Sequence, residues 1–525
     1  MVFSHDVPEE FNLASYLLDR HLEEGRGDNV AVYFEKEAIT YAALAEASNR
    51  LGNALLGLGV EQENRVMICL PDCPQFMASY FGAMKIGGVP VPVNTMLLPQ
   101  DYLYFLNDSR AKVLIVHQDF APKIRQIRSS LHYLKHCIVV GEPEKGELRY
   151  DSLLADASPK LAPAATSKDD MAFWMYSSGT TGKPKAVVHL HHDMMYFMPP
   201  HCKEVLSIRE DDIVFSISKL YFSYGRNNSL ESPFIGGASV VLYPGAPEPE
   251  KVLDVIEQYH PTLFYGVPSS YMAILTYLDK TGRLCDLSSI RHCVSAGEPL
   301  PKVIFERWRE KFGLELLDTV GSTDVGGEYL SNKPGLIKPG SSGVLLSGFE
   351  ARLVDDEGHD VEQGEIGSLW IKNDGTAAYY WNKHQKTKES FYGEWFNTGD
   401  KFYMDSDGFY WYVGRADDLF KAAGIWVSPL EVEGTLLEHP AVNQCTVIGA
   451  PDATGLEKPM AFIVLNDGYS SSEELERELQ NFVRSKIAHY KCPRWIRFVD
   501  DLPRTATGKV QRYKLRESID AEHRQ

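Results

Sequence analysis

The sequence predicts an α/β protein, with a large N-terminal domain of several α/β subdomains and a β-rich part, followed by a small α+β C-terminal domain. Three observations lead to this expectation. The chain has 525 residues, more than one hydrophobic core usually organises. Helix-like and strand-like patterns alternate over most of its length, which is typical of layered α/β folds. The pattern becomes β-rich after about residue 340 and changes again near residue 415.

The first 170 residues show the alternation clearly. Residues 41–60, YAALAEASNRLGNALLGLGV, repeat apolar positions at spacings of three and four and end in glycines, which predicts an amphipathic helix. The short apolar runs RVMICL (65–70), VPVPVN (89–94) and KVLIVH (112–117) predict buried strands. Helices packed on a sheet are therefore expected here.

The same alternation continues with the strand candidates ASVVLY (238–243), PTLFYGV (261–267) and IRHCVSAG (290–297). The stretch KVIFERWREKFG (302–313) is a helix candidate between them and the next region, and no fixed-period repeat is visible. Residues 349–372 and 407–415 are rich in β-forming residues with Gly and Asp turns.

The domain boundary is expected at the GRADD stretch, between residues 1–414 and 415–525, because charged and small residues there separate two differently patterned regions. The C-terminal part has helix candidates at 429–440 and 472–487 and strand candidates at 443–450 and 460–466. Residues beyond 487 are expected to form a loop-rich basic tail.

Composition excludes several classes of protein. The chain is 44% hydrophobic and 24% charged, which is typical of a globular protein, and its formal charge of −19 argues against nucleic-acid binding. Eight scattered cysteines without a C-x-x-C pair are expected to be reduced thiols in a cytoplasmic protein. The N-terminal residues are acidic where a signal peptide is basic, and no run of eighteen apolar residues predicts a membrane span.

A loop rich in glycine and hydroxyl groups, YSSGTTGKPK, occupies residues Tyr176 to Lys185. Backbone amides and a lysine in such a loop are suited to wrapping a phosphate. It is not a P-loop, because only two residues separate Gly179 from Gly182 and Lys183 is followed by proline. We therefore expect a phosphate-binding loop of another type.

Five further stretches follow this loop in order: SAGEPLP (295–301), GSTD (321–324), NTGD (397–400), GRADDLFKAAG (414–424) and PRTATGKVQR (503–512). The ordered set resembles the adenylate-forming enzymes, which include acyl-CoA synthetases, peptide-synthetase adenylation domains and firefly-type luciferases. Over nearly the whole chain the sequence is most similar to benzoate-CoA ligases. The choice within the family rests mainly on FNLASYLL, AVYFEKEAITYAALAEASNRL, KLYFSYG and PTLFYGVPSSY.

The resemblance implies a two-step reaction. A carboxylate attacks the α-phosphate of ATP, which is bound with Mg²⁺, pyrophosphate leaves, and the thiol of coenzyme A then displaces AMP from the acyl-adenylate. It also implies a hinge at Asp417, about which the C-terminal domain turns between two poses, with Lys509 reaching the α-phosphate in the first pose only. The partners implied are small molecules: an aromatic carboxylate, ATP and coenzyme A.

The resemblance assigns roles residue by residue. It assigns catalysis to Lys509, Asp324 and Thr323, with Asp324 also next to the metal. It assigns ATP binding to Ser177, Ser178, Gly179, Thr180, Thr181, Gly182, Lys185, Gly297, Glu298, Pro299, Asp318, Val320, Gly321, Ser322, Asp400 and Arg415. It assigns acid binding to Tyr224, Gly225, Val267, Gly297 and Gly327, and the coenzyme A side to Lys421, Gly424, Ile425 and Trp426.

The sequence departs from the family pattern at three places. Asp324 stands where the family usually has Glu, so its reach is about 1.3 Å shorter. Val320 stands where many relatives stack a tyrosine on adenine. Gly326 and Gly327 replace a bulkier stretch and are expected to widen the acid pocket, which leaves a substituted benzoate or a non-aromatic ring acid open.

Several alternatives remain at this stage. An alicyclic or medium-chain acyl-CoA synthetase, or an enzyme that loads a carrier protein, would share the nucleotide motifs. The stretch HLHHD (189–193) has metal-ligand residue types, but short His tracts without a distant partner cluster are more often structural. A monomer or homodimer is expected, and a lysine acetyltransferase acting on Lys509 would stop adenylation by removing its charge.

Overall fold

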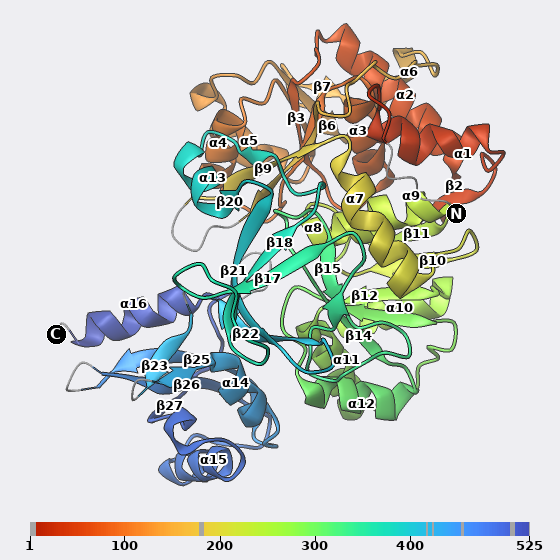
Figure 1. Cartoon of the computed structure of the whole chain (residues 1–525). Coiled ribbons are helices and arrows are strands. Elements are labelled where there is room, and N and C mark those ends of the chain that lie inside the picture. Colours follow the sequence, from red (N-terminus) through yellow and green to blue (C-terminus); the bar gives the residue numbers. More distant parts are fainter. Residues whose placement is uncertain are drawn as a thin grey trace.

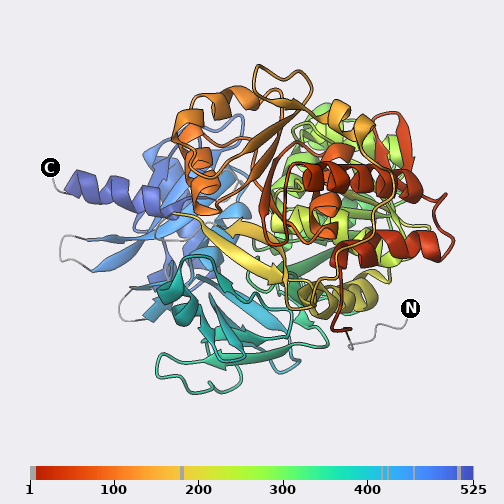
Figure 2. The ribbon, with the colours of Figure 1, turned by 90° about the horizontal axis from the view of Figure 1, so that it is seen from above.

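The computed structural model describes residues 7–177, 183–415, 418–422, 425–452, 456–504 and 510–523. It has a large N-terminal α/β domain with mixed sheets and a smaller C-terminal domain, as the sequence predicts. Figure 1 shows the C-terminal domain in blue at the edge of the β-rich part, and Figure 2 shows the same arrangement from above.

The largest sheet of the N-terminal domain is nine-stranded. Its six inner strands, from β14 to β1, are parallel, and the strands outside them pair antiparallel. In spatial order the strands are β16 (Val344–Leu345), β15 (Glu328–Ser331), β14 (Leu316–Gly321), β13 (His292–Ser295), β12 (Leu263–Gly266), β10 (Ile213–Ser216), β11 (Ser239–Leu242), β1 (Val30–Phe34) and β2 (Glu37–Thr40). Strands buried on both faces read as continuous apolar runs, which explains the sequence pattern.

A second, five-stranded sheet is entirely parallel. Its strands in spatial order are β4 (Val89–Pro92), β3 (Arg65–Cys69), β5 (Val113–His117), β6 (His136–Val140) and β7 (Leu148–Arg149). A three-stranded antiparallel sheet carries the segments before and after the glycine-rich loop, and consists of β19 (Tyr379–Tyr380), β9 (Lys185–Leu190) and β8 (Met171–Ser177).

The β-rich part is an antiparallel sheet whose strands are β17 (Glu350–Val354), β18 (Gly367–Lys372), β21 (Trp395–Met404), β20 (Phe391–Tyr392) and β22 (Tyr410–Arg415). The C-terminal domain has the hairpin β23 (Phe420–Ala422) and β24 (Ile425–Val427), and a sheet of β25 (Val442–Pro451), β26 (Glu457–Leu465) and β27 (Trp495–Phe498). Ser428 in the C-terminal part donates a hydrogen bond to the Val413 carbonyl of β22, which joins the two parts.

Helices cover the sheets (Figure 1). Those of the N-terminal domain are η1 (Ser15–Asp19), α1 (Arg20–Glu23), α2 (Tyr41–Gly57), α3 (Pro74–Lys85), α4 (Pro99–Asp108), α5 (Ala121–Arg125), η2 (Arg128–Ser130), α6 (Tyr150–Asp156), α7 (Asp193–Pro200), η3 (His201–Leu206), α8 (Ser223–Arg226), η4 (Asn227–Glu231), α9 (Ser232–Gly236), α10 (Pro249–Tyr259), α11 (Pro268–Thr281), α12 (Lys302–Phe312) and α13 (His384–Ser390). Those of the C-terminal domain are α14 (Pro429–Leu437), α15 (Glu473–Lys486), η5 (His489–Lys491) and α16 (Arg512–His523).

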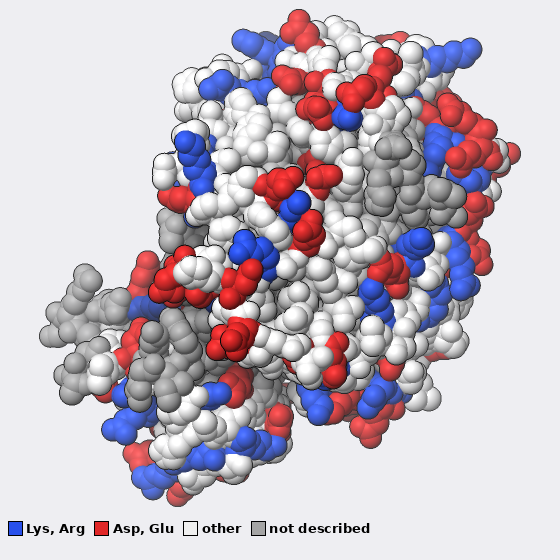
Figure 3. All heavy atoms as spheres, in the orientation of Figure 1, with Lys and Arg blue, Asp and Glu red and all other residues white. Residues whose placement is uncertain are grey.

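The predicted loop-rich tail is wrong in one respect, because residues Arg512–His523 form helix α16. The helix is held by few groups. Leu515 and Ile519 are buried against β25 and β26, and Arg512 and Arg516 both pair with Asp418, at 3.5 and 2.7 Å. None of the described helices is long and apolar enough to cross a membrane. On the face shown in Figure 3, acidic and basic side chains are interspersed.

Helices α2 and α3 cross at two glycines, Gly52 and Gly82. A Cβ atom on Gly82 would lie 2.6 Å from the Ser48 carbonyl oxygen and 3.2 Å from the Gly52 nitrogen, so the helix backbones meet directly. We expect Gly82→Ala to lower the free energy of unfolding by about 1–3 kcal/mol, because the two helices must separate. A thermal melt measures the effect.

Gly57→Ala in the same helix α2 is the matched control, since nothing lies within 4 Å of its Cβ position. Alanine is the better helix former, so this change is expected to stabilise by up to about 1 kcal/mol. Equal melting temperatures for wild type and Gly82→Ala would contradict the close helix crossing.

Candidate active site

A lysine, an aspartate and a tyrosine from three separate segments meet at the centre of the N-terminal domain. Lys185 begins β9, Asp324 follows β14, and Tyr380 ends β19. The Lys185 Nζ lies 2.9 Å from Oδ1 of Asp324, and the Tyr380 hydroxyl donates a hydrogen bond of 2.5 Å to the same oxygen. The ammonium also lies 3.7 Å from the centre of the Tyr380 ring, a cation–π contact.

This group of three is largely removed from solvent, with 16% of the Lys185 side chain and 14% of the Asp324 side chain exposed. Burial lowers the pKa of Lys185, and the Asp324 carboxylate opposes that shift. Tyr380 was not among the residues predicted from sequence, because nothing in its local pattern indicates a contact with a residue 56 positions away.

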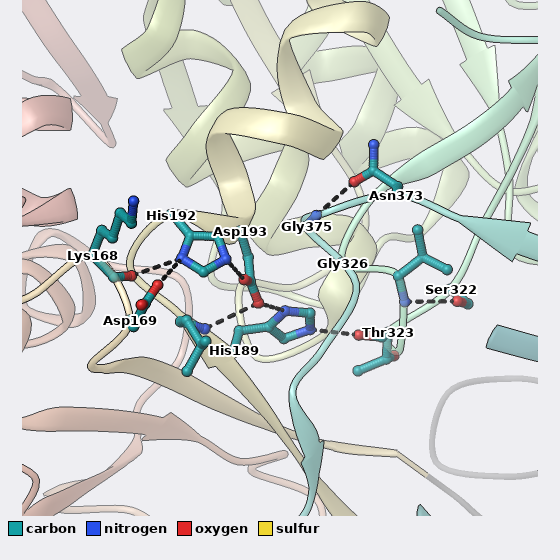
Figure 4. Close-up of polar contacts among 12 residues, drawn as sticks. Lys168, Asp169, His189, His192, Asp193, Ser322, Thr323, Gly326, Asn373 and Gly375 are labelled. Carbon is teal, nitrogen blue, oxygen red and sulfur yellow. Dashed lines mark hydrogen bonds and ion pairs between the residues drawn. The ribbon is translucent and has the colours of Figure 1, made fainter. Parts of the chain in front are cut away.

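The loop before Asp324 is tied to β9 through a buried histidine (Figure 4). The Nε2–H of His189 donates a hydrogen bond of 2.8 Å to the carbonyl of Thr323. Its Nδ1 lies 2.9 Å from Oδ2 of Asp193, which also accepts a bond from the Leu190 amide. The ring stacks on Phe173 at 4.9 Å. His189 therefore fixes the backbone at one of the predicted catalytic residues.

The other two histidines of HLHHD are also held by protein groups. His191 accepts a bond from the Leu13 amide at 3.1 Å. His192 lies 3.0 Å from Asp169 and 3.2 Å from Asp193, and contacts the Lys168 carbonyl at 2.9 Å (Figure 4). Within the described ranges no group of three or more His, Cys, Asp or Glu is arranged to hold a metal ion. All three histidines of the motif therefore contact other protein groups.

Asp400 and Arg415 are direct partners on the neighbouring strands β21 and β22. Their side chains approach to 3.2 Å. The backbone amide of Asp400 donates a hydrogen bond of 3.1 Å to the Thr398 hydroxyl. Burial raises the pKa of the Tyr329 hydroxyl well above its usual value, and the charges of Asp400, Arg415 and Asp324 also act on it. The structure thus brings the β-rich sheet and the Asp324 loop into one region.

Strand β14 carries the predicted nucleotide residues Asp318, Val320 and Gly321, and Ser322 follows it. Burial raises the pKa of Asp318 well above its usual value. Val320 is half-buried and offers an apolar surface. Ser322 holds the turn through its hydroxyl, which accepts a bond from the Val325 amide at 3.1 Å.

The predicted acid-binding residues group around the ends of β12 and β13. The Tyr224 hydroxyl lies 3.3 Å from the carbonyls of both Gly266 and Val294. Gly297 has a φ of +84°, which favours glycine, and its Cβ position would lie 3.8 Å from Val267. Next to them, Glu298 accepts a bond from the Ser269 amide at 3.3 Å, and the exposed Pro299 follows.

Gly225 and Gly327 are both needed for close packing. A Cβ on Gly225 would lie 2.1 Å from the Lys219 carbonyl oxygen. The expectation that Gly326 and Gly327 widen the pocket is wrong, because the ring of Phe197 from α7 fills the space beside them. Their Cβ positions would lie 2.4 and 2.6 Å from atoms of that ring.

Some of the predicted residues cannot be placed. Ser178, Gly179, Thr180, Thr181, Gly182, Asp417, Gly424 and Lys509 lie outside the described residues. Ser177 ends β8, beside the glycine-rich loop. The backbones of Lys421, Ile425 and Trp426 belong to the hairpin of β23 and β24, where Lys421 pairs with Trp426.

The chemistry of this region suits a polyphosphate bound with a cation. Lys185 and Arg415 supply positive charge, and Asp324 supplies a carboxylate oxygen of the kind Mg²⁺ prefers. Magnesium sites that use one carboxylate and the phosphate oxygens of a nucleotide are common, so the residues present fit that ion.

Comparisons with known proteins find matches over nearly the whole chain. A model of the AMP-binding enzyme family matches residues 18–381, and a model of the AMP-binding enzyme C-terminal domain matches residues 431–509. A 4-hydroxybenzoate–CoA/benzoate–CoA ligase of Rhodopseudomonas palustris is 44% identical, covering 97% of this chain and 94% of that protein. A benzoate–CoA ligase of Thauera aromatica is 42% identical, covering 97% and 96%. The crystal structure of an anthranilate CoA ligase in complex with anthranoyl-AMP matches with a TM-score of 0.95 at 42% identity, over 100% of both chains.

Proposed function

Because this chain belongs to the AMP-binding enzyme family, we propose that it ligates an aromatic carboxylic acid, benzoate or a close analogue, to coenzyme A. The reaction passes through an acyl-adenylate and releases AMP and pyrophosphate. The observation that carries the proposal is the similarity to benzoate-type CoA ligases at 42–44% identity over 97% of the chain. The matched region includes the segments assigned here to acid binding as well as the nucleotide motifs.

In the first step, a carboxylate oxygen of the acid attacks the α-phosphorus of ATP, and the bond to the bridging oxygen of pyrophosphate breaks. We assign Lys185, with Thr180, Thr181 and Gly182, to the leaving phosphates. Lys185 is suited to this role because it stands in a partly buried site, where its charge acts more strongly than in water. Asp400 and Arg415 are assigned to the ribose side of the nucleotide.

Magnesium would be held by Asp324 and the phosphate oxygens. When bound, the ion neutralises charge on the phosphates and stabilises the charge that develops on the leaving group. Tyr380 and Lys185 orient the Asp324 carboxylate by contacting its Oδ1, and His189 orients the preceding residue through the Thr323 carbonyl. The Asp324 carboxylate and the backbone before it are thus both held in place by hydrogen bonds.

In the second step, the thiol of coenzyme A attacks the acyl carbon, its proton goes to solvent, and AMP leaves. We propose that the domains are 1–414 and 415–525 and that the second turns about Asp417 between the steps. Lys509 then serves adenylation, and the hairpin bearing Lys421, Gly424, Ile425 and Trp426 serves thioester formation. We propose a cytoplasmic location, because all eight cysteines are free and thiols stay reduced in that compartment. We also propose that the enzyme is a monomer or a homodimer, and that a lysine acetyltransferase acts on Lys509.

The direct test is thioester formation with AMP and pyrophosphate quantified, across benzoates, cyclohexane carboxylate and hexanoate. We expect a benzoate-type acid to have the highest kcat/KM, at least about tenfold above the others, as pocket contacts of one or two groups allow. A preference for alicyclic or straight-chain acids would contradict the aromatic assignment. Release of AMP without a thioester would indicate a carrier protein as the acceptor.

His189 gives a prediction about positioning. In His189→Asn the amide nitrogen takes the place of Nδ1 and keeps the contact to Asp193, but the bond to Thr323 is lost. The Thr323 backbone is then no longer held in place, and misplacing a positioned group by an ångström can cost up to about 100-fold in rate. We expect part of this effect to appear as a KM for ATP about tenfold higher. Steady-state kinetics of pyrophosphate release measures this.

His189→Gln is the comparison at the same position, since its amide nitrogen takes the place of Nε2 and keeps the bond to Thr323. This variant should stay closer to wild type in its KM for ATP. His191→Gln controls for general destabilisation, because His191 contacts Leu13 rather than Thr323. An unchanged KM for ATP in His189→Asn would contradict the positioning role.

A further inference from the structure

Three charged side chains are buried in the segments that carry Gly225 and Gly327, two of the proposed acid-binding residues. Arg226 ends α8, Glu231 ends the π-helical segment η4, and Glu328 begins β15. Their relative exposures are 0%, 0% and 3%. The π-helix, with its i to i+5 repeat, places Glu231 on the same side as Arg226, and the Arg226 Nε lies 3.5 Å from Oε1 of Glu231. We call these three residues the buried charge cluster.

The hydrogen bonds of this cluster are incomplete among the described residues. Nη2 of Arg226 donates to Asn227 Oδ1 at 2.7 Å and to the Gly326 carbonyl at 3.2 Å. Its Nε and Nη1, both carboxylate oxygens of Glu231 and Oε2 of Glu328 form no hydrogen bond in the described chain. A buried polar atom without a hydrogen bond destabilises the folded state, so a group of them calls for an explanation.

The charges in the cluster are unequal as well. The cluster holds one guanidinium and two carboxylates, and Nδ1 of His201 lies 3.9 Å from Oε2 of Glu328. Burial lowers the pKa of His201 to about 3, so it is neutral near pH 7. Burial raises the pKa of Glu328 to about 7, with Arg226 opposing the shift. The cluster therefore has acceptor capacity in excess of its donors, and Oε2 of Glu328 is part of that excess.

Glu328 lies next to the acid-binding residues. It directly follows Gly327, and Arg226 directly follows Gly225. Burial raises the pKa of the Tyr224 hydroxyl and that of the Tyr265 hydroxyl, and the charge of Glu328 adds to both shifts, so its carboxyl group lies within electrostatic reach of both. The Arg226 bond to the Gly326 carbonyl joins the two segments. Glu328 thus belongs to a segment that is hydrogen-bonded to the segment carrying Tyr224 and Gly225.

Resting on the proposed function, we propose that Glu328 is a specificity-determining residue that accepts a hydrogen bond from a donor substituent on the aromatic ring of the acid. An amino or a hydroxyl group supplies such a donor, and the ionised form of Glu328 accepts it. A second carboxylate on the ring is disfavoured, because the site already holds two carboxylates against one guanidinium. A methyl group of the same size would leave Glu328 buried and without a partner.

The test compares ring substituents of equal size on the wild-type enzyme. Adenylation is followed as pyrophosphate release with aminobenzoates, hydroxybenzoates and methylbenzoates substituted at the same ring position. We expect kcat/KM for the best donor-bearing acid to exceed that of its methyl counterpart by at least about 100-fold, since sites with buried polar groups reject analogues that lack the partner. The better of the amino and hydroxyl acids then identifies the donor.

Glu328→Leu and Glu328→Gln test the residue itself. In Glu328→Leu the donor-to-methyl ratio should fall to about one or invert, and in Glu328→Gln it should fall at least about tenfold, because the amide is a weaker and uncharged acceptor. Glu231→Gln is the matched control, the same change on the other carboxylate of the cluster, and should keep the wild-type ratio. Activity on methylbenzoate shows that each variant is folded.

The outcomes separate this inference from the proposed function. If benzoate and methylbenzoates are adenylated as well as the donor-bearing acids, or if the ratio is unchanged in both Glu328 variants, the role of Glu328 is overturned and the proposed function stands. A ratio that changes in Glu231→Gln but not in Glu328→Gln overturns the assignment to Glu328. If no aromatic acid is adenylated while hexanoate or cyclohexane carboxylate is, the proposed function itself fails.

Discussion

Replacing Lys509 with alanine is expected to lower the rate of acyl-adenylate formation by about 1000-fold. The proposed role is electrostatic: its ammonium bridges the attacking carboxylate and the α-phosphate, and a long stem with a point charge is suited to two anions. Loss of one such group from an active site typically costs about 100- to 1000-fold in rate. Pyrophosphate release in a single turnover with saturating ATP and acid measures this step alone.

The second half-reaction provides the internal control. Thioester formation from supplied acyl-adenylate and coenzyme A should stay within a few-fold of wild type, because Lys509 is proposed to be withdrawn in that pose. Lys509→Gln, which resembles acetyl-lysine, should behave as the alanine variant does. Lys514→Gln, the same change on the exposed face of α16, should leave both steps unchanged. Equal losses in the two half-reactions would show that Lys509 acts on folding and not on adenylation.

Asp324→Asn is expected to lower adenylation by about 100-fold. The change removes the negative charge that pairs with Lys185 at 2.9 Å and accepts the Tyr380 hydroxyl bond, so the Lys185 ammonium is left partly buried without its partner. It also removes the carboxylate proposed to hold magnesium. Adenylation rates measured over a range of magnesium concentrations, with ATP saturating, test both consequences.

Asp324→Glu is the matched variant for this position, since it keeps the charge and has the side chain that the family usually carries there. The longer side chain must be accommodated beside Tyr380, so we expect a loss of about tenfold or less. A magnesium requirement that is the same in Asp324→Asn and wild type would contradict the metal role while leaving the contact with Lys185 in place.

The fold could be predicted from sequence wherever the local pattern is strong. The helix expected over 41–60 is α2, Tyr41–Gly57, and the apolar runs became β3, β4 and β5. Helix α16 was missed because only Leu515 and Ile519 are buried along it, and its ion pairs to Asp418 depend on a residue almost a hundred positions away. A pattern of two apolar residues in a charged segment does not indicate a helix.

The site shows the same limit. Lys185, Asp324 and Asp400 could be named because short motifs carry them. Tyr380 and His189 could not, since their contacts to Asp324 and Thr323 span 56 and 134 residues. The expectation that Gly326 and Gly327 widen the acid pocket was also wrong, because the ring that fills the space beside them comes from Phe197 on a distant helix. Glu328 was not singled out, because its burial depends on contacts between distant segments, such as the bond from Arg226 to the Gly326 carbonyl.

The ion pairs of α16 have a consequence for how a rotation about Asp417 is transmitted. Asp418, the next residue, is paired with Arg516 at 2.7 Å, and Arg512 binds both oxygens of Glu433 at 2.8 and 2.9 Å. Lys509 is three residues before Arg512. Helix α16, which begins three residues after Lys509, is therefore tied by ion pairs to the residue beside the proposed pivot. Arg512 and Glu433 are mostly buried, so dissolved salt screens their ion pair weakly. A turn about the proposed pivot would then carry helix α16 with it at the ionic strength of a cell.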